Sequence, residues 1–277
     1  MVRPPAVAGI FYPDSKEQLS QLLKPWLVES RPRGPRPVML VAPHAGIIYS
    51  GQVAGSAYQQ LIGQRYRRVM ILGVSHQANL PYAVVDDHIV WETPLGPVAT
   101  DKKLVNLILV NQLIRKEGQP HLDEHSLEMQ LIFLQQVLGS SFTICPILLG
   151  QINLTTGRFI GQKLATALDQ DTLLVISSDL AHYPPAEVAV KTDNQVIEAF
   201  IQGIAESFLD RVRQVEEAGY PGLVTAACGA KAMAVGLMAG KIIGPLTYQL
   251  QAYAHSGQVA GDQSRVVGYA AITGYKK

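Results

Sequence analysis

This sequence of 277 residues has few cysteines, almost no net charge and few long apolar runs. Two cysteines, Cys145 and Cys228, are too few for a disulfide framework, so a reducing compartment is expected. Lysine and arginine number 23 against 22 aspartate and glutamate residues, which argues against a nucleic-acid surface. The most apolar stretch, residues 223–245, is interrupted by Lys231 and Lys241 and predicts a buried core helix rather than a membrane span. The N-terminal segment has no apolar stretch of signal-peptide length, so we expect a cytoplasmic protein.

The sequence does contain short, apolar, β-branched runs that alternate with helix-like segments. The runs lie at residues 38–42, 69–72, 142–149 and 173–176. Their continuous apolarity predicts strands that are buried on both faces. The helix-like segments lie at residues 51–62, 101–111, 126–138, 158–168 and 193–202. This alternation predicts a three-layer α/β fold, with helices on both faces of a central, mostly parallel or mixed sheet, and residues 1–277 are expected to form one domain.

Polar side chains follow three of the predicted strands at nearly the same offset. His44 follows the first strand, His76 the second, and Asp179 and His182 the last. Ligands of open α/β sheets bind beyond the carboxyl ends of the strands. If these strands are parallel neighbours, the four side chains face one crevice, where two imidazoles and a carboxylate suit a divalent metal. Taken singly, each histidine is more often a hydrogen-bonded loop residue, and Asp179 could equally be a helix cap.

The two cysteines differ in their surroundings. Cys228 stands where a helix rich in small residues is expected to begin, and a helix N-terminus lowers a thiol pKa and favours the thiolate that binds metal. Cys145 lies within a predicted strand, where the role of a small buried hydrophobe is expected. Residues 73–77 start like the nucleophile elbow of α/β-hydrolases, with Ser75 at the place of the nucleophile. Gln77 replaces the second glycine of that motif, so a serine hydrolase is a weak alternative.

The remaining histidines give less distinct signals. His121 and His125 are four residues apart and could share a helix face, with Glu124 beside them, but the zincin motif is absent. His88 lies in a polar stretch and is expected to be solvated. His255 could line a pocket, but the role of a turn residue is expected.

Several motifs extend over most of the chain. They are residues 6–12, 43–46 with 49–51, 72–76, 123–130, 177–182, 228–229, and 253–254 with 268–271. In this order they resemble the Memo family, whose prokaryotic members are called AmmeMemoRadiSam system protein B. The resemblance implies a fold like that of the catalytic subunit of class III extradiol dioxygenases, which are non-haem iron(II) enzymes. It also implies that two histidines and a cysteine, here His44, His76 and Cys228, bind iron or copper.

Two departures limit what the resemblance implies. Cys228 stands where the ring-cleaving dioxygenases have a glutamate, so ring cleavage itself is not expected. Ala230 and Lys231 stand where the animal member has an arginine and a histidine, which changes the rim of the pocket. The animal member is described as binding phosphotyrosine peptides, a role that is not transferred here.

The resulting hypothesis is a metal-dependent redox enzyme. His44, His76 and Cys228 hold iron(II), with copper or zinc as the alternatives. His182 is the acid–base group and Asp179 orients it. Further pocket residues are Tyr49, Glu124, His125 and His255. The rival hypothesis is a module that binds a peptide or partner protein in the same pocket without turnover. The family name also implies AMMECR-type and radical-SAM proteins as partners.

Overall fold

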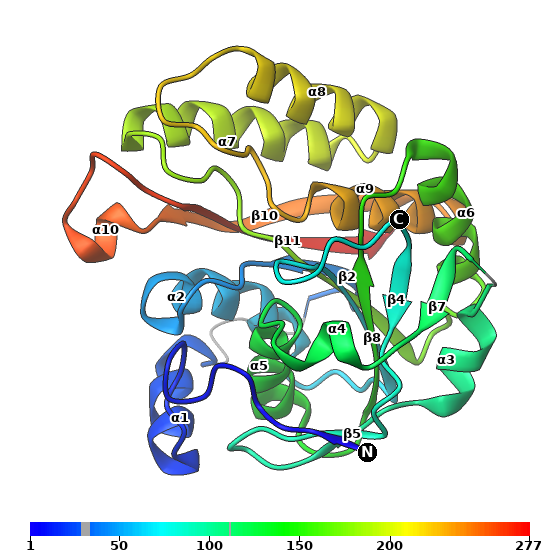
Figure 1. Cartoon of the computed structure of the whole chain (residues 1–277). Coiled ribbons are helices and arrows are strands. Elements are labelled where there is room, and N and C mark those ends of the chain that lie inside the picture. Colours follow the sequence, from blue (N-terminus) through cyan, green and yellow to red (C-terminus); the bar gives the residue numbers. More distant parts are fainter. Residues whose placement is uncertain (29–33, 111) are drawn as a thin grey trace.

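Four parallel strands form the centre of the computed structural model, which describes residues 1–28, 34–110 and 112–277 (Figure 1). They are β2 (Pro37–Ala42), β9 (Thr172–Ser177), β3 (Arg68–Val74) and β8 (Thr143–Leu149), in this spatial order. Each pair of neighbours in the series is parallel. The four predicted strands are therefore confirmed, and their carboxyl ends lie at one edge of the sheet.

Further strands extend this sheet to eight. On one side, β11 (Gly268–Lys276) pairs antiparallel with β2, and β10 (Leu246–His255) pairs antiparallel with β11. On the other side, β4 (Ala83–Val85) pairs antiparallel with β8 and parallel with β7 (Ile114–Lys116). A small second sheet contains β1 (Val2–Arg3), β5 (Val90–Trp91) and β6 (Val98–Ala99).

The predicted helical segments correspond to helices of the structure. These are α2 (Ile47–Tyr58), α3 (Lys102–Ile108), α5 (Glu128–Leu138), α6 (Leu154–Ala165) and α7 (Ala186–Ile201). Residue 111, the predicted end of the second segment, lies outside the described residues. The predicted core helix is α9 (Ala230–Ile243). The other helices are α1 (Lys16–Leu23), α4 (Gln119–Leu122), α8 (Ala205–Glu217) and α10 (Gly257–Ala260), with 3-10 turns at Lys24–Trp26 and Gln59–Leu61.

Alternate residues of each central strand enter two different cores. In β2, Met39 and Val41 face the core under α6, α7, α8 and α9, while Leu40 and Ala42 face the core under α1, α2 and α5. Successive side chains of a strand point to opposite faces of the sheet, so the two cores lie on opposite faces. Helices therefore cover both faces of the sheet (Figure 1). The structure thus confirms the predicted three-layer α/β class.

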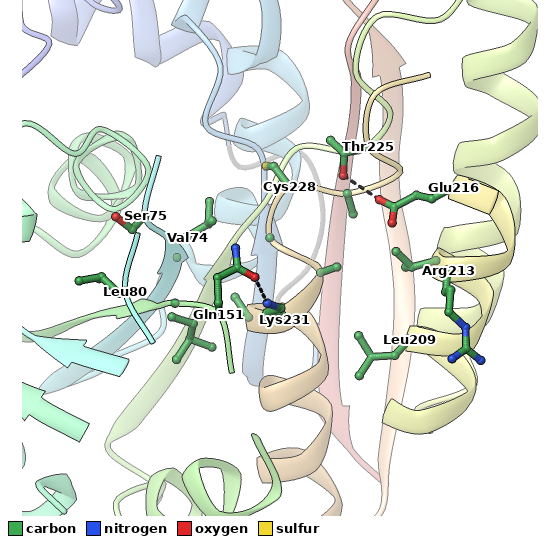
Figure 2. A pocket seen from close by; sticks show the side chains of 18 of the residues that line it. Val74, Ser75, Leu80, Gln151, Leu209, Arg213, Glu216, Thr225, Cys228 and Lys231 are labelled. Atoms are coloured by element: carbon green, nitrogen blue, oxygen red, sulfur yellow. Dashed lines mark hydrogen bonds between the residues drawn. The ribbon is translucent and has the colours of Figure 1, made fainter. Parts of the chain in front are cut away.

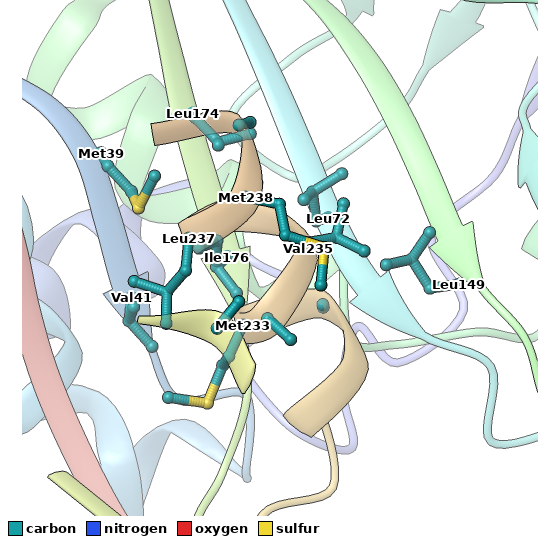
Figure 3. Packing of buried hydrophobic residues seen from close by; sticks show 14 of the residues in the cluster. Met39, Val41, Leu72, Leu149, Leu174, Ile176, Met233, Val235, Leu237 and Met238 are labelled. Atoms are coloured by element: carbon teal, nitrogen blue, oxygen red, sulfur yellow. The ribbon is translucent and has the colours of Figure 1, made fainter. Parts of the chain in front are cut away.

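Two helices, α9 and α2, pack closely on opposite faces of the sheet. Figure 3 shows α9 lying on the sheet, with Val235 and Leu237 among the side chains of β2, β3 and β9. Each such side chain, when fully buried, contributes about 1.5–3 kcal/mol to stability. On the opposite face, a Cβ at Gly51 would lie 2.3 Å from the Trp26 ring, so only glycine allows this indole to cover α2. Within the described ranges, no helix is both long and apolar enough to span a membrane.

Candidate metal centre

The loops that follow β2, β3 and β9 meet at the carboxyl edge of the sheet. His44, His76 and Asp179 each lie two residues beyond their strand. The backbone N–H of His44 donates to Asp179 Oδ1 at 2.8 Å, and the His44 and His76 ring centroids are 5.2 Å apart. The prediction that these three loops share one sheet edge is confirmed.

A third imidazole, that of His125, joins this edge. Its ring centroid lies 4.6 Å from that of His76, with the two rings stacked, and 5.4 Å from that of His44. One ring nitrogen from each of the three histidines lies within 4.8 Å of the others, a grouping that could hold a metal ion. His44 is almost fully buried, whereas the other two rings are partly exposed. We call His44, His76 and His125 the histidine cluster.

The Ser177 hydroxyl bonds to Nδ1 of His44 and so fixes the tautomer of this ring. We call Nδ1 the outer nitrogen of His44 and of His76, and Nε2 the inner one. Ser177 Oγ lies 2.9 Å from His44 Nδ1, donates its hydrogen to the Ser126 carbonyl at 2.6 Å and accepts from Gln130 Nε2 at 2.7 Å. Because a serine hydroxyl has only one hydrogen, it must accept from Nδ1 of His44. The proton of His44 is thereby on Nδ1, which leaves the lone pair of Nε2 free to bind a metal.

The outer nitrogen of His76 is fixed by a carboxylate. Glu124 Oε1 lies 2.9 Å from His76 Nδ1 and accepts from the Ser126 backbone at 2.8 Å, while Oε2 accepts from the His76 backbone at 2.6 Å. Burial alone would raise the pKa of Glu124, but the hydrogen bond and charge of His76 outweigh it and lower the pKa to about 2. An ionised carboxylate only accepts, so Nδ1 of His76 carries a proton and Nε2 is the nitrogen that can bind a metal once the ring is neutral. Carboxylate–histidine pairs of this kind orient the ligands of many metal sites.

The protonation states of two of the three rings suit metal binding. Burial, followed by the effect of the nearby His76, lowers the pKa of His44 to about 3. Burial, followed by the effect of His44, lowers the pKa of His125 to about 4. Both rings are therefore neutral at pH 7 and carry a lone pair. For His76, burial lowers the pKa but the hydrogen bond and charge of Glu124 outweigh it, so its pKa is raised.

An arginine near the N-terminus holds the loop that carries Glu124 and His125. Arg3 is fully buried; its Nη2 donates to the Glu124 carbonyl at 2.6 Å, and its Nη1 forms an ion pair with Glu128 at 2.6 Å. Arg3 Nε also donates to the carbonyl of His121. Sequence reasoning missed Arg3, because nothing in a short N-terminal segment signals a partner more than a hundred residues away.

Cys228 lies beside the histidine cluster, just before α9. Its Sγ is 3.3 Å from His44 Nε2 and accepts from the Asp179 backbone N–H at 3.3 Å. The expectation of a lowered thiol pKa is wrong, because burial, and then the charge of Asp179, raise the pKa of Cys228 to about 12. A thiolate here would need a neighbouring cation for its stability. Cys145 is fully buried in β8, as predicted.

Asp179 and His182 lie on a loop that α7 and β11 hold in place. Burial raises the pKa of Asp179, although the hydrogen bond from His44 opposes this. Burial lowers the pKa of His182, and its buried Nε2 has no hydrogen-bond partner within the described ranges. Asp193 of α7 accepts from the Ala181 backbone at 2.9 Å. A Cβ at Gly268 would lie 1.8 Å from Asp193 Oδ2, so glycine is required opposite this carboxyl group.

The structure places the other two predicted pocket residues, Tyr49 and His255, on α2 and β10. Tyr49, in the first turn of α2, is exposed and lines a surface hollow with Phe11, whose ring centroid is 4.9 Å from that of His125. The expectation of a turn at His255 is wrong: it is the last residue of β10, is nearly buried and pairs with Gly268 of β11. Ser75 Oγ accepts from the Ala78 backbone and bonds to no histidine among the described residues, which gives a serine hydrolase no support.

Two expectations about other histidines are wrong. His88 is not solvated: it is 5% exposed, and its Nδ1 lies 2.7 Å from Asp86 Oδ1 in a second grouping of ionisable side chains, with Asp87. His121 and His125 do not share a helix face, because α4 ends at Leu122. His121 is instead fully buried, with its ring centroid 6.0 Å from that of Trp91.

A cavity of about 430 Å³ lies beside Cys228, between the start of α9, α8 and the residues that follow β3 and β8 (Figure 2). Cys228 is part of its wall and contacts His44. A molecule in this cavity would therefore lie next to a residue that touches the histidine cluster.

Comparison with known proteins agrees with the sequence motifs. The family model described as Memo-like protein matches residues 3–273. A MEMO1 family protein of Thermoplasma volcanium is 33% identical over 98% of both chains, and one of Aquifex aeolicus is 36% identical over 97% of both. The crystal structure of an uncharacterized protein from Escherichia coli K12 shares the fold, with a TM-score of 0.57 and 14% identity over 85% of this chain and 99% of that one. The chain belongs to the Memo family.

Proposed function

We propose that this protein binds a divalent transition metal at the histidine cluster and uses it in redox chemistry on a small molecule. The observation that carries the proposal is that Ser177 and Glu124 occupy Nδ1 of His44 and His76, so that Nε2 of each ring is the nitrogen left to bind a metal. Metal-binding histidines almost always have such a partner on their other ring nitrogen. The free Nε2 atoms of His44 and His76 would be the first two ligands.

Two residues compete for the next position. His125 offers a neutral imidazole within the cluster, and Cys228 offers a sulfur that contacts His44 Nε2. Imidazole with thiolate favours borderline or soft transition metals over magnesium or calcium. Among these metals, the resemblance to non-haem iron(II) enzymes makes iron(II) the first choice, with copper or zinc as the alternatives. A bound cation would also stabilise the thiolate of Cys228 against the burial that raises its pKa.

The bound iron or copper would supply a centre that changes oxidation state, and the chain's own residues would handle protons. His182 is suited to accept a proton, since its ring is held neutral by burial and its buried Nε2 bonds to no group of the described chain. Asp179 favours the protonated form of His182 through its charge and fixes the His44 backbone. Arg3 would act indirectly, by positioning the Glu124 loop.

The test is elemental analysis of protein purified without air or chelators, followed by oxygen uptake with catechol-like compounds. We expect near-stoichiometric iron or copper in the wild type and its loss in His44→Ala and His76→Ala, with folding checked by circular dichroism. Cys228→Ala and His125→Ala identify the third ligand, and Cys145→Ala is the matched thiol control. Full metal content in both the His44 and His76 variants would contradict the proposed centre.

The rival function, a peptide or partner-binding module, uses the same pocket without turnover. It would be favoured if the metal-loaded protein consumed no oxygen with any of the compounds. If oxygen is consumed, His182→Ala should lower the rate of uptake, since an acid–base step is typically worth about 100- to 10,000-fold. We also propose, from the family name alone, AMMECR-type and radical-SAM partner proteins. We also propose that residues 1–277 form one domain and that the protein is cytoplasmic.

A further inference from the structure

The cavity beside Cys228 has the size and position of a substrate pocket. Its volume of about 430 Å³ falls in the range of roughly 300–1,000 Å³ that small-molecule sites occupy. It lies beyond the carboxyl ends of β3 and β8, where ligands of open α/β sheets bind. Much of its wall is apolar, and the larger apolar residues in it are Val74, Leu80, Leu149, Leu209 and Val212. A ligand with an apolar body is therefore favoured.

Three charged residues line this cavity, and two of them are engaged elsewhere. Arg213 turns along the exposed surface of α8, where its Nη2 donates to Asp210 at 2.8 Å. Glu216 accepts from Thr225 Oγ1 at 2.9 Å and from the Ala226 backbone at 3.0 Å, so it holds the loop that leads to Cys228 (Figure 2). These contacts leave Lys231 as the charged group that is available to a ligand.

Lys231 has only a neutral partner. Its Nζ donates to Gln151 Oε1, and the two side chains turn toward each other in Figure 2. Within the part of the chain that the structure describes, it takes part in no ion pair. Its partial burial lowers its pKa, which reflects incomplete solvation of the ammonium group. A carboxylate in place of the amide would give a shorter and stronger charge-assisted hydrogen bond.

We propose that this cavity binds a small carboxylic acid with an apolar body, whose carboxylate pairs with Lys231. The apolar body would lie against Leu209 and Val212, and the molecule would extend toward Cys228. The positive end of the α9 dipole favours the same polarity. This inference deepens the proposed function by naming the substrate class and rests on it for any chemistry, although binding can be measured separately.

The test uses three probes of one shape: phenylacetate, its neutral amide phenylacetamide, and the cation 2-phenylethylamine. Binding to the wild type is measured by ligand-observed NMR titration. The amide carbonyl can also accept from Lys231 but carries no charge, and a hydrogen bond between two charged groups is roughly twice as strong, so phenylacetate should bind about tenfold more tightly than the amide. Lys231→Gln should erase this preference, and Lys231→Glu should transfer it to the amine.

Two further variants locate the effect. Lys241→Gln removes the same charge at the far end of α9, where it lines a different hollow, and should leave the preference unchanged. Ala230→Phe should fill the cavity and abolish binding of all three probes. Equal binding of phenylacetate and phenylacetamide by the wild type, or loss of the preference in Lys241→Gln, would overturn the inference. Metal content should stay unchanged in Lys231→Gln. If the wild type holds no metal but still prefers phenylacetate through Lys231, the proposed function is refuted and the carboxylate site is not.

Discussion

The buried carboxyl group of Asp193 should make the free energy of unfolding depend on pH. This residue of α7 is fully buried; Oδ1 accepts from the Ala181 backbone at 2.9 Å, and Oδ2 accepts from Tyr253 at 2.8 Å. No cation pairs with it within the described ranges. Burial raises its pKa from 3.8 to about 7, although both hydrogen bonds oppose the shift. The loop that carries Asp179 and His182 thus depends on a carboxyl group that folding keeps largely protonated below neutral pH.

The sign and size of the effect on stability follow from this shift. Above pH 3.8 the unfolded chain releases the Asp193 proton while the folded chain keeps it, so stability falls with rising pH until about pH 7 and is then constant. A shift of about three units at 1.36 kcal/mol each sets an upper limit of about 4 kcal/mol. Asp193→Asn keeps an acceptor for Ala181 and never ionises. We expect the variant to be about 2–4 kcal/mol more stable than the wild type at pH 8 and equal to it near pH 4.

The assay is guanidinium unfolding of both proteins over this pH range, with Asp210→Asn as the control. Asp210 is a mostly exposed aspartate of α8 that pairs with Arg213 three residues away, an interaction typically worth about 0.3–0.5 kcal/mol. The control should therefore follow the wild type closely at every pH. If Asp193→Asn shows the same pH dependence as the wild type, Asp193 is ionised in the fold and the reasoning from burial is refuted.

Other predictions test the metal centre and the core. Glu124→Gln should weaken metal binding by about 10- to 100-fold in competition with a chelator, because a neutral amide replaces the carboxylate that orients His76; unchanged affinity would contradict that role. In the folded protein a thiol reagent should modify Cys228 slowly and Cys145 not at all, as mass spectrometry can establish, since Cys228 is partly exposed and Cys145 is not; equal modification would count against this assignment. Phe200→Ala should lower the free energy of unfolding by about 3–5 kcal/mol, because its buried ring packs against Phe208; a smaller loss would mean that the cavity collapses.

Local features of the sequence were enough to predict the layers and one edge of the site. Each central strand is a continuous apolar run, and such a run is stable only when helices cover both faces. Polar residues directly after such strands must lie at a sheet edge. His44, His76 and Asp179 could therefore be placed together before any contact was known.

Properties that depend on the surroundings could not be predicted in this way. His88 lies in a polar stretch, yet Asp86 satisfies it in a buried position. The start of α9 suggested a lowered thiol pKa for Cys228, but burial and the charge of Asp179 raise it. In both cases long-range packing decides the solvation of the group, and solvation outweighs the local signal.

By itself, the sequence determined the α/β layers, the four central strands and the strand-end positions of His44, His76 and Asp179, because periodicity and strand polarity are local properties. Only the tertiary structure decided that β9 lies between β2 and β3, and that His125 joins the cluster. It also decided which nitrogens are free, because Glu124 approaches His76 from a loop 48 residues away. Such contacts exist only after the chain has closed these long loops, and no local pattern records which segments will meet.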